Sequence, residues 1–136
     1  MKKLIIASVV LLTAACNTAK YDEAEKQRIA KGDAEVAERL AGYQAGETRT
    51  CLPSASNRDL ERYSNRTLML KQGGRIYVQQ LDEGCRNVDR FGVTLVTKST
   101  TGSYCRGDML RLVDSSTGSF YGLCALNDWT VYEKTD

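Results

Sequence analysis

The sequence contains no histidine, and only one of its 136 residues is proline. Without an imidazole base, catalysis by a Ser-His-Asp or a Cys-His set is excluded. The cysteines beyond residue 16 form no CxxC pair. This absence, together with the missing histidine, counts against a structural zinc site and against a thioredoxin-like redox motif. We therefore expect neither a metal nor a cofactor.

Long apolar runs are equally scarce, since the only one occupies residues 4–12, directly after Lys2 and Lys3. A run of nine residues is too short to cross a bilayer core, which needs about 20. A basic start, a short apolar run and small residues after it are typical of a secretory signal peptide. We therefore expect residues 1–15 to be a signal that is removed.

The end of this segment, LTAAC at residues 12–16, resembles the bacterial lipobox, although Thr13 stands where leucine is usual. The resemblance implies that the Cys16 thiol carries a diacylglycerol and that Cys16 becomes the first mature residue, acylated with palmitate-type chains. Several acyl chains together give stable anchoring. Because Asn17, and not an aspartate, follows Cys16, we expect the outer membrane, facing the periplasm. Ordinary cleavage after Ala15 without a lipid is the alternative.

Removing residues 1–15 leaves 121 residues, enough for one compact domain and a tether. The loss of Lys2 and Lys3 lowers the basic residues from 19 to 17, which equals the 17 acidic residues. A neutral mature chain gives no argument for binding nucleic acid. We expect a monomer with a lipidated helical spacer at residues 16–46 and a disulfide-stapled β domain at residues 47–136.

Residues 17–46 are rich in alanine and in charged residues, which favours a helix. Four apolar residues fall on one helical stripe, namely Ile29, Val36, Leu40 and Tyr43. Gly46 is the expected stop, and Gly32 weakens the middle by about 1 kcal/mol relative to alanine. Four stripe residues do not make a sustained heptad seam. We interpret the helix as a solvated spacer, separable from the domain, with a partner-binding or coiled-coil helix as the alternative.

From Glu47 onward, short apolar runs alternate with turns. Strands are predicted at residues 48–52, 67–70, 75–78, 91–97, 109–113, 120–126 and 129–132. Gly73-Gly74 and the SSTG stretch at residues 115–118 predict two hairpins, and Pro53 ends the first strand. Six to eight short strands predict a mainly β fold, a small antiparallel β-barrel or sandwich.

Lipidation of Cys16 leaves four cysteines, Cys51, Cys85, Cys105 and Cys124, in an oxidising compartment. Two disulfides are therefore expected, and three pairings are open. We favour Cys51–Cys124, which would close the first strand on the last, with Cys85–Cys105. A Cys105–Cys124 bond across the final hairpin is the main alternative.

The cysteine order and several short motifs resemble an uncharacterised family of small secreted proteobacterial lipoproteins with a four-cysteine β domain. The matching stretches lie at residues 64–68, 77–81, 85–86, 105–108 and 124–127. The chain departs from the family pattern at Gln79, Arg86 and Asn127, and it lacks both acids before Arg66. The family has no known activity, so the resemblance implies location and fold but no mechanism.

A carboxylate pair for glycoside hydrolysis needs two acids facing each other. The candidate acids are Glu61, Asp82, Glu83, Asp89, Asp108 and Asp114. Nothing in the sequence fixes their separation, so we interpret them as surface acids. The Arg106-Gly107-Asp108 tripeptide matches an adhesion motif, which we attribute to chance.

The stretch at residues 115–121 is similar to the S-G-x-x-Y type loop of membrane-bound lysozyme inhibitors. In that interpretation Ser116 donates to a catalytic carboxylate, Gly118 shapes the turn and Tyr121 is the anchoring side chain. The alternative is an ordinary hairpin turn in which Tyr121 belongs to a strand. The sequence as a whole predicts a non-enzymatic envelope lipoprotein with a periplasmic binding or structural domain of unknown ligand. A lysozyme-type inhibitor and a carboxylate-dependent hydrolase are the alternatives.

Overall fold

The computed structural model describes residues 15–52, 60–81, 85–98 and 102–136. These ranges contain one helix, α1 (Ala15–Arg39), and eight strands: β1 (Tyr43–Arg49), β2 (Glu61–Tyr63), β3 (Thr67–Gln72), β4 (Arg75–Gln80), β5 (Val93–Thr97), β6 (Met109–Asp114), β7 (Phe120–Ala125) and β8 (Trp129–Lys134). The predicted mainly β class is confirmed. The signal segment before Ala15, Pro53, Asp82 and Glu83 lie outside the described residues. Within the described residues, no helix is both long enough and apolar enough to cross a membrane.

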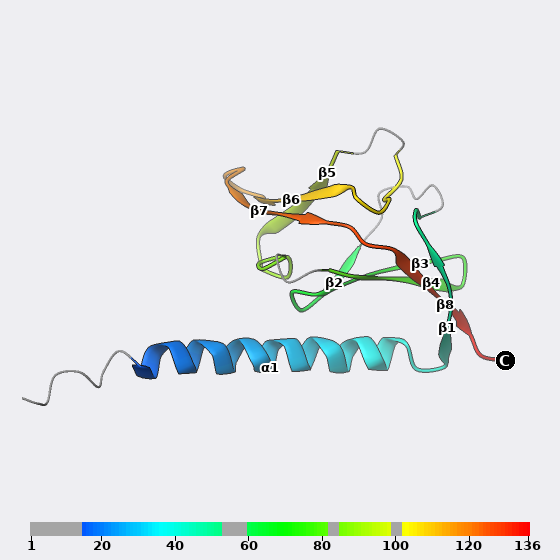
Figure 1. Ribbon diagram of the computed structural model, residues 1–136, viewed down its shortest axis with the longest axis horizontal. Coiled ribbons are helices and arrows are strands. Elements are labelled where there is room, and N and C mark those ends of the chain that lie inside the picture. The colour runs from blue at the N-terminus through cyan, green and yellow to red at the C-terminus, as the bar shows by residue number, and fades with distance from the viewer. Residues whose placement is uncertain (1–14, 53–59, 82–84, 99–101) are drawn as a thin grey trace, which may run out of the picture.

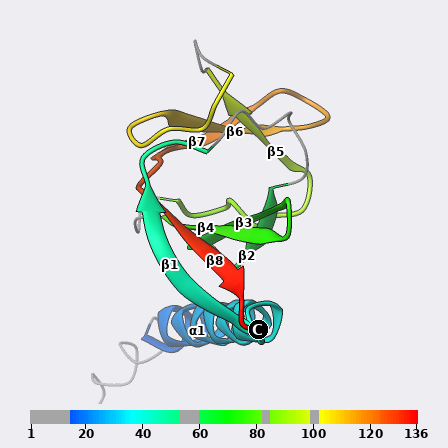
Figure 2. The same cartoon turned by 90° about the vertical axis from the view of Figure 1, so that its right-hand side faces the viewer.

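The strands form two antiparallel sheets that do not close into a barrel. One sheet has five strands in the order β1-β8-β4-β3-β2, and the other has three in the order β5-β6-β7. Figures 1 and 2 show three layers, with α1 on one side of the five-stranded sheet and the three-stranded sheet on the other. Of the two predicted architectures, the sandwich describes this arrangement.

The middle layer is apolar on both faces because alternate strand residues point to opposite sides. From β3, Leu68 and Leu70 join the main core beneath the three-stranded sheet, whereas Met69 joins a second cluster beneath α1. The β3–β4 hairpin is confirmed, and Gly73 and Gly74 turn it with φ of +60° and +79°. These positive angles are the ones that glycine adopts without strain.

The start of the β structure differs from the prediction. Gly42, with φ of +80°, turns the chain after α1, and β1 begins at Tyr43 rather than at residue 48. Gly46 does not stop the helix; it lies in a β-bulge between Ala45 and Thr48, where β1 pairs with β8. The predicted boundary at residue 47 therefore falls inside a paired strand.

Two other strands differ in extent. The three-residue β2 was not predicted, because only its last residue, Tyr63, is apolar and buried. β5 begins at Val93 and not at Phe91, because Gly92 turns the chain with φ of +79°. The final hairpin of β6 and β7 and the last strand β8 are confirmed.

The two predicted disulfides form, but the favoured pairing is wrong. Cys51 is bonded to Cys105 and Cys85 to Cys124. β1 does pair with the last strand, but Cys124 lies on β7 in the other sheet. The alternative Cys105–Cys124 bond is also wrong, because Cys124 lies opposite the inward-facing Leu110 and meets buried Cys85. Each bond therefore joins the five-stranded side of the molecule to the three-stranded side.

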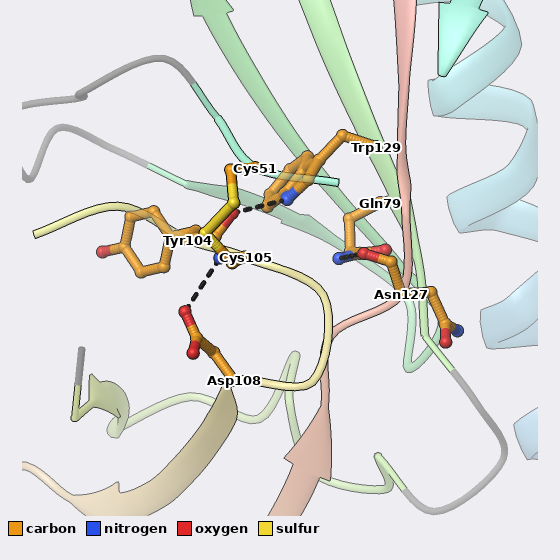
Figure 3. Close-up of a disulfide and its surroundings, with 7 residues drawn as sticks. All are labelled: Cys51, Gln79, Tyr104, Cys105, Asp108, Asn127 and Trp129. Atoms are coloured by element: carbon orange, nitrogen blue, oxygen red, sulfur yellow. Dashed lines mark hydrogen bonds between the residues drawn. A yellow bond between two sulfur atoms is a disulfide. The ribbon is translucent and has the colours of Figure 1, made fainter. Parts of the chain in front are cut away.

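Figure 3 shows how the Cys51–Cys105 bond sits against the main core. Trp129, which is fully buried, donates its indole N–H to the carbonyl oxygen of Tyr104 at 3.0 Å. The amide of Cys105 donates to the Asp108 carboxylate at 2.8 Å. A tryptophan that finds a partner for its N–H can be buried without loss of a hydrogen bond.

The end of α1 and the residues that follow it pack on the five-stranded sheet. Val36 of α1, Leu40 just after the helix and Tyr43 at the start of β1 pack against a cluster made of Tyr63, Met69, Ile76 and Val78. Polar contacts extend the same interface, since Arg28 pairs with Asp89 at 3.4 Å and Arg39 with Glu61 at 3.2 Å. In this structure α1 covers one face of the sheet, in contrast to the solvated spacer that the sequence predicted.

Gly32 lies where α1 closely approaches the turn between β2 and β3. A Cβ atom on Gly32 would lie 2.6 Å from the Cβ and 2.8 Å from the backbone nitrogen of Ser64. Ser64 is itself held at φ of +53° in the turn between β2 and β3. The glycine that weakens an isolated helix therefore allows this helix to dock.

Substitution of Gly32 by alanine distinguishes a docked helix from a free one. In a free helix Gly32→Ala stabilises by about 1 kcal/mol. In the docked helix the methyl group meets backbone, and overpacking of this kind costs about 1–3 kcal/mol. We expect Gly32→Ala to lower the melting temperature of the chain from residue 16 by about 4 °C or more. The control is Asp33→Ala at the exposed neighbouring position, which should leave the melting temperature unchanged or raise it. If both variants raised the melting temperature, α1 would not dock.

Candidate partner-binding surface

The outer side of the three-stranded sheet, here called the outer β face, is unusually apolar. Its exposed large side chains are Val96, Met109, Phe120 and Leu123, which are 43%, 43%, 55% and 47% exposed. In the part of the chain that the structure describes, Phe91 is the only other exposed large apolar side chain. Single exposed apolar residues are ordinary, whereas a contiguous group marks an interaction surface.

Strand register places these side chains together. Val96, Arg111 and Leu123 form one row across β5, β6 and β7. Because β-strand residues alternate between faces, Met109 lies on the same side as Arg111. Leu110 and Leu112 point the other way and are fully buried in the main core. The outer β face thus collects outward-pointing apolar residues from all three strands, one from β5, one from β6 and two from β7.

Arg111 lies in the centre of this face. Its guanidinium carbon is 5.7 Å from the centroid of the Phe120 ring, a cation–π distance. The strands β5, β6 and β7 are fully described, and Arg111 is the only charged residue on their outer side. The surface therefore combines an apolar field with one central positive charge.

The predicted loop residues lie at one end of this sheet, in the turn organised by Asp114. The Asp114 carboxylate accepts hydrogen bonds from the Ser116 hydroxyl at 2.5 Å, the Ser116 amide at 2.8 Å and the Thr117 amide at 2.9 Å. Gly118 has φ of +70°, and its amide donates to the Asp114 carbonyl oxygen. The Ser116 hydroxyl is therefore engaged inside the turn.

Tyr121 is half-buried and packs against the main core. Its hydroxyl donates to the Asp114 carboxylate at 3.4 Å, and the guanidinium of Arg90 lies 4.9 Å from its ring centroid. The exposed aromatic residue of this region is Phe120, its neighbour in β7. The sequence singled out Ser116, Gly118 and Tyr121, and it offered Asp114 only as a candidate hydrolytic acid. The roles of Arg111 and Phe120 were missed. An aspartate before a Ser-Ser-Thr-Gly stretch is the pattern of an Asx turn and would have indicated the role of Asp114 in the turn.

The candidate hydrolytic acids within the described ranges have structural partners. Glu61 and Asp89 line one open groove of about 810 Å³, but each is paired with an arginine of α1. The Asp108 carboxylate accepts from the Cys105 amide, so the Arg-Gly-Asp tripeptide forms part of a turn. No three histidine, cysteine or acidic side chains in the described ranges lie together as a metal-binding group.

The hydrogen bonds around Asp114 make its turn sensitive to acid. The Ser116 hydroxyl and then the Thr117 and Ser116 amides hold the pKa of Asp114 well below its usual range. A lowered native pKa means that the carboxylate stabilises the fold above the unfolded pKa of about 3.9. This stabilisation is lost as the pH falls from about 3.9 towards the native pKa.

We expect Asp114→Asn to reduce the acid sensitivity of the domain. The fall in melting temperature between about pH 7 and about pH 3 should be smaller in Asp114→Asn than in the wild type. Asp33→Asn, at an exposed helix position, serves as the control and should match the wild type. If the melting temperature fell equally in the wild type and in Asp114→Asn, the Asp114 carboxylate would not be a source of the acid sensitivity.

Comparisons with protein families, curated proteins and solved structures gave no match for this chain. The resemblance to small secreted proteobacterial lipoproteins, the lipid on Cys16 and the outer-membrane location therefore remain predictions.

Proposed function

We propose that this chain is a non-enzymatic lipoprotein of the bacterial envelope, anchored at Cys16 on the outer membrane and facing the periplasm. In this proposal it binds a protein partner through the outer β face. The observation that carries the proposal is the group of four exposed apolar side chains around Arg111. Arginine, phenylalanine and methionine are enriched in the centres of protein interfaces.

The position of α1 supports an anchor at Cys16. Cys16 is the second residue of α1, and α1 lies on the side of the five-stranded sheet opposite the outer β face (Figure 1). An anchored helix would leave the outer β face accessible. Two disulfides within the domain fit an oxidising compartment such as the periplasm.

The chemistry of the face indicates its partner. An apolar partner surface with one carboxylate opposite Arg111 would match both the apolar field and the charge. A second copy of the chain is a poorer match, because a two-fold contact centred on Arg111 would bring two guanidinium groups together. We therefore favour a monomer that binds a different protein.

The anchor is tested by mass spectrometry of the mature N-terminus. We expect a peptide that begins at Cys16 and carries diacylglycerol together with an N-terminal acyl chain. Cys16→Ser should prevent acylation and release the chain from the membrane fraction, since stable anchoring requires the acyl chains. An unmodified Cys16 in the wild-type protein would contradict the anchor without affecting the outer β face.

The binding face is tested with Leu123→Asp, which places a charge in the apolar field. We expect the yield of partner cross-linked in intact envelopes to fall about tenfold or more, as when an interface hot spot is lost. The matched control is Phe91→Asp, which changes a fully exposed apolar side chain outside this sheet. Equal yields for both variants would contradict the proposal.

An inhibition assay with the same proteins tests the lysozyme-inhibitor alternative. If the wild type inhibited a c-type lysozyme, and if Tyr121→Ala abolished inhibition while Leu123→Asp did not, the turn and not the outer β face would be the binding element. We expect no inhibition, because the Ser116 and Tyr121 hydroxyls are bonded to Asp114. Tyr121→Ala should instead destabilise the domain, since the ring packs against the main core.

A further inference from the structure

A pocket of about 320 Å³ lies between the first half of α1 and two turns of the β structure. This volume falls within the range of small-molecule sites. Three cations line it: Lys26 from α1, Arg66 from the turn between β2 and β3, and Arg86 from the turn after β4. The ion pairs found among the described residues involve none of these three side chains.

The pocket also offers oxygen acceptors. Asp22 and Glu25 bring carboxylates from α1, and Asn65 brings a side-chain amide from the turn between β2 and β3. Asn65 is only 9% exposed, and its Nδ2 donates to Glu25 at 3.0 Å. Its Oδ1 is buried and has no hydrogen-bond partner within the described residues. A buried acceptor without a partner costs about 1–3 kcal/mol, and this oxygen becomes satisfied when the Asn65 amide turns towards the pocket and a ligand donates to it.

Three cations beside three oxygen acceptors complement a ligand with both charges. A phosphate accepts charge-assisted hydrogen bonds from lysine and arginine. A primary ammonium has three N–H donors, which matches the two carboxylates and the Asn65 carbonyl oxygen. A simple anion would be attracted by the cations but repelled by Asp22 and Glu25.

We propose that this pocket binds the phosphoethanolamine headgroup of a membrane phospholipid. The membrane as the source of this ligand rests on the anchor proposed at Cys16. The chemistry of the ligand rests only on the residues that line the pocket. Asp22 follows Cys16 by six residues, which corresponds to about 9 Å along a helix. An anchor at Cys16 therefore holds the pocket close to the headgroups of the same membrane.

The test uses the mature chain from residue 16 with Cys16→Ser, so that acyl chains do not contribute to binding. Its probes are glycerophosphoethanolamine, glycerophosphocholine and inorganic phosphate, titrated by calorimetry. We expect glycerophosphoethanolamine to bind at least about tenfold more tightly than glycerophosphocholine, whose methylated nitrogen has no N–H donors. Inorganic phosphate should bind more weakly than glycerophosphoethanolamine. Equal affinities for the three probes, or no binding of glycerophosphoethanolamine, would overturn the proposal.

Variants test which residues bind the phosphate and which bind the ammonium group. Arg66→Gln combined with Arg86→Gln should weaken glycerophosphoethanolamine binding by about tenfold or more, equivalent to about 1.4 kcal/mol. Arg75→Gln combined with Arg106→Gln is the matched control, because both arginines are exposed and neither lines this pocket, and it should bind like the parent chain. Asp22→Asn changes an exposed helix residue and should reduce the preference for glycerophosphoethanolamine over glycerophosphocholine. Unchanged affinity in the double arginine variant, or an unchanged preference in Asp22→Asn, would contradict the assignment.

Vesicles identify the source of the headgroup. The Cys16→Ser chain should float with phosphatidylcholine vesicles that contain phosphatidylethanolamine and should not float with phosphatidylcholine alone. Binding of the soluble headgroup without flotation would overturn the membrane as the source. The Cys16→Ser variant cannot be acylated at residue 16. Either flotation result is therefore independent of whether Cys16 is acylated in the wild type.

Discussion

The strands β3 and β4 need cover on both faces, and the rest of the structure follows from this requirement. Leu68, Leu70 and Tyr77 point to one side and are covered by the three-stranded sheet. Met69, Ile76 and Val78 point to the other side, where α1 covers them. Because the three-stranded sheet is the last layer, its own outer side has no cover within the described chain. The apolar surface around Arg111 is what remains after the two inner interfaces are made.

The two interfaces are held by different means. Both disulfides join the five-stranded side to the three-stranded side, and a disulfide typically stabilises by about 2–4 kcal/mol. The interface with α1 has no crosslink within the described residues and depends on a small apolar cluster and the close approach at Gly32. Its exposed ion pair between Arg39 and Glu61 contributes little, about 0–1 kcal/mol. The pocket lined by Lys26, Arg66 and Arg86 lies in this second interface, so its formation depends on the docking of α1.

Local signals in the sequence predicted much of this arrangement. The glycine pair at Gly73 and Gly74 and the Ser-Ser-Thr-Gly turn fixed two hairpins, because these turns need residues that adopt positive φ. Long-range geometry was not predictable in the same way. The disulfide partners depend on which sheet holds Cys124, and the role of Gly32 depends on its contact with Ser64. In the candidate site, the turn was predicted but Arg111 was not, because its central position follows from strand register.

Amide hydrogen exchange on the chain from residue 16 shows whether α1 is a layer of the fold. If α1 covers the sheet, amides around Val36 and Leu40 should exchange through the same opening that exposes β3 and β4. Their opening free energies would then approach those of the Met69 and Val78 amides. If these helix amides exchanged near the rate of an isolated, fraying helix while the β strands stayed protected, α1 would not be a layer of the fold.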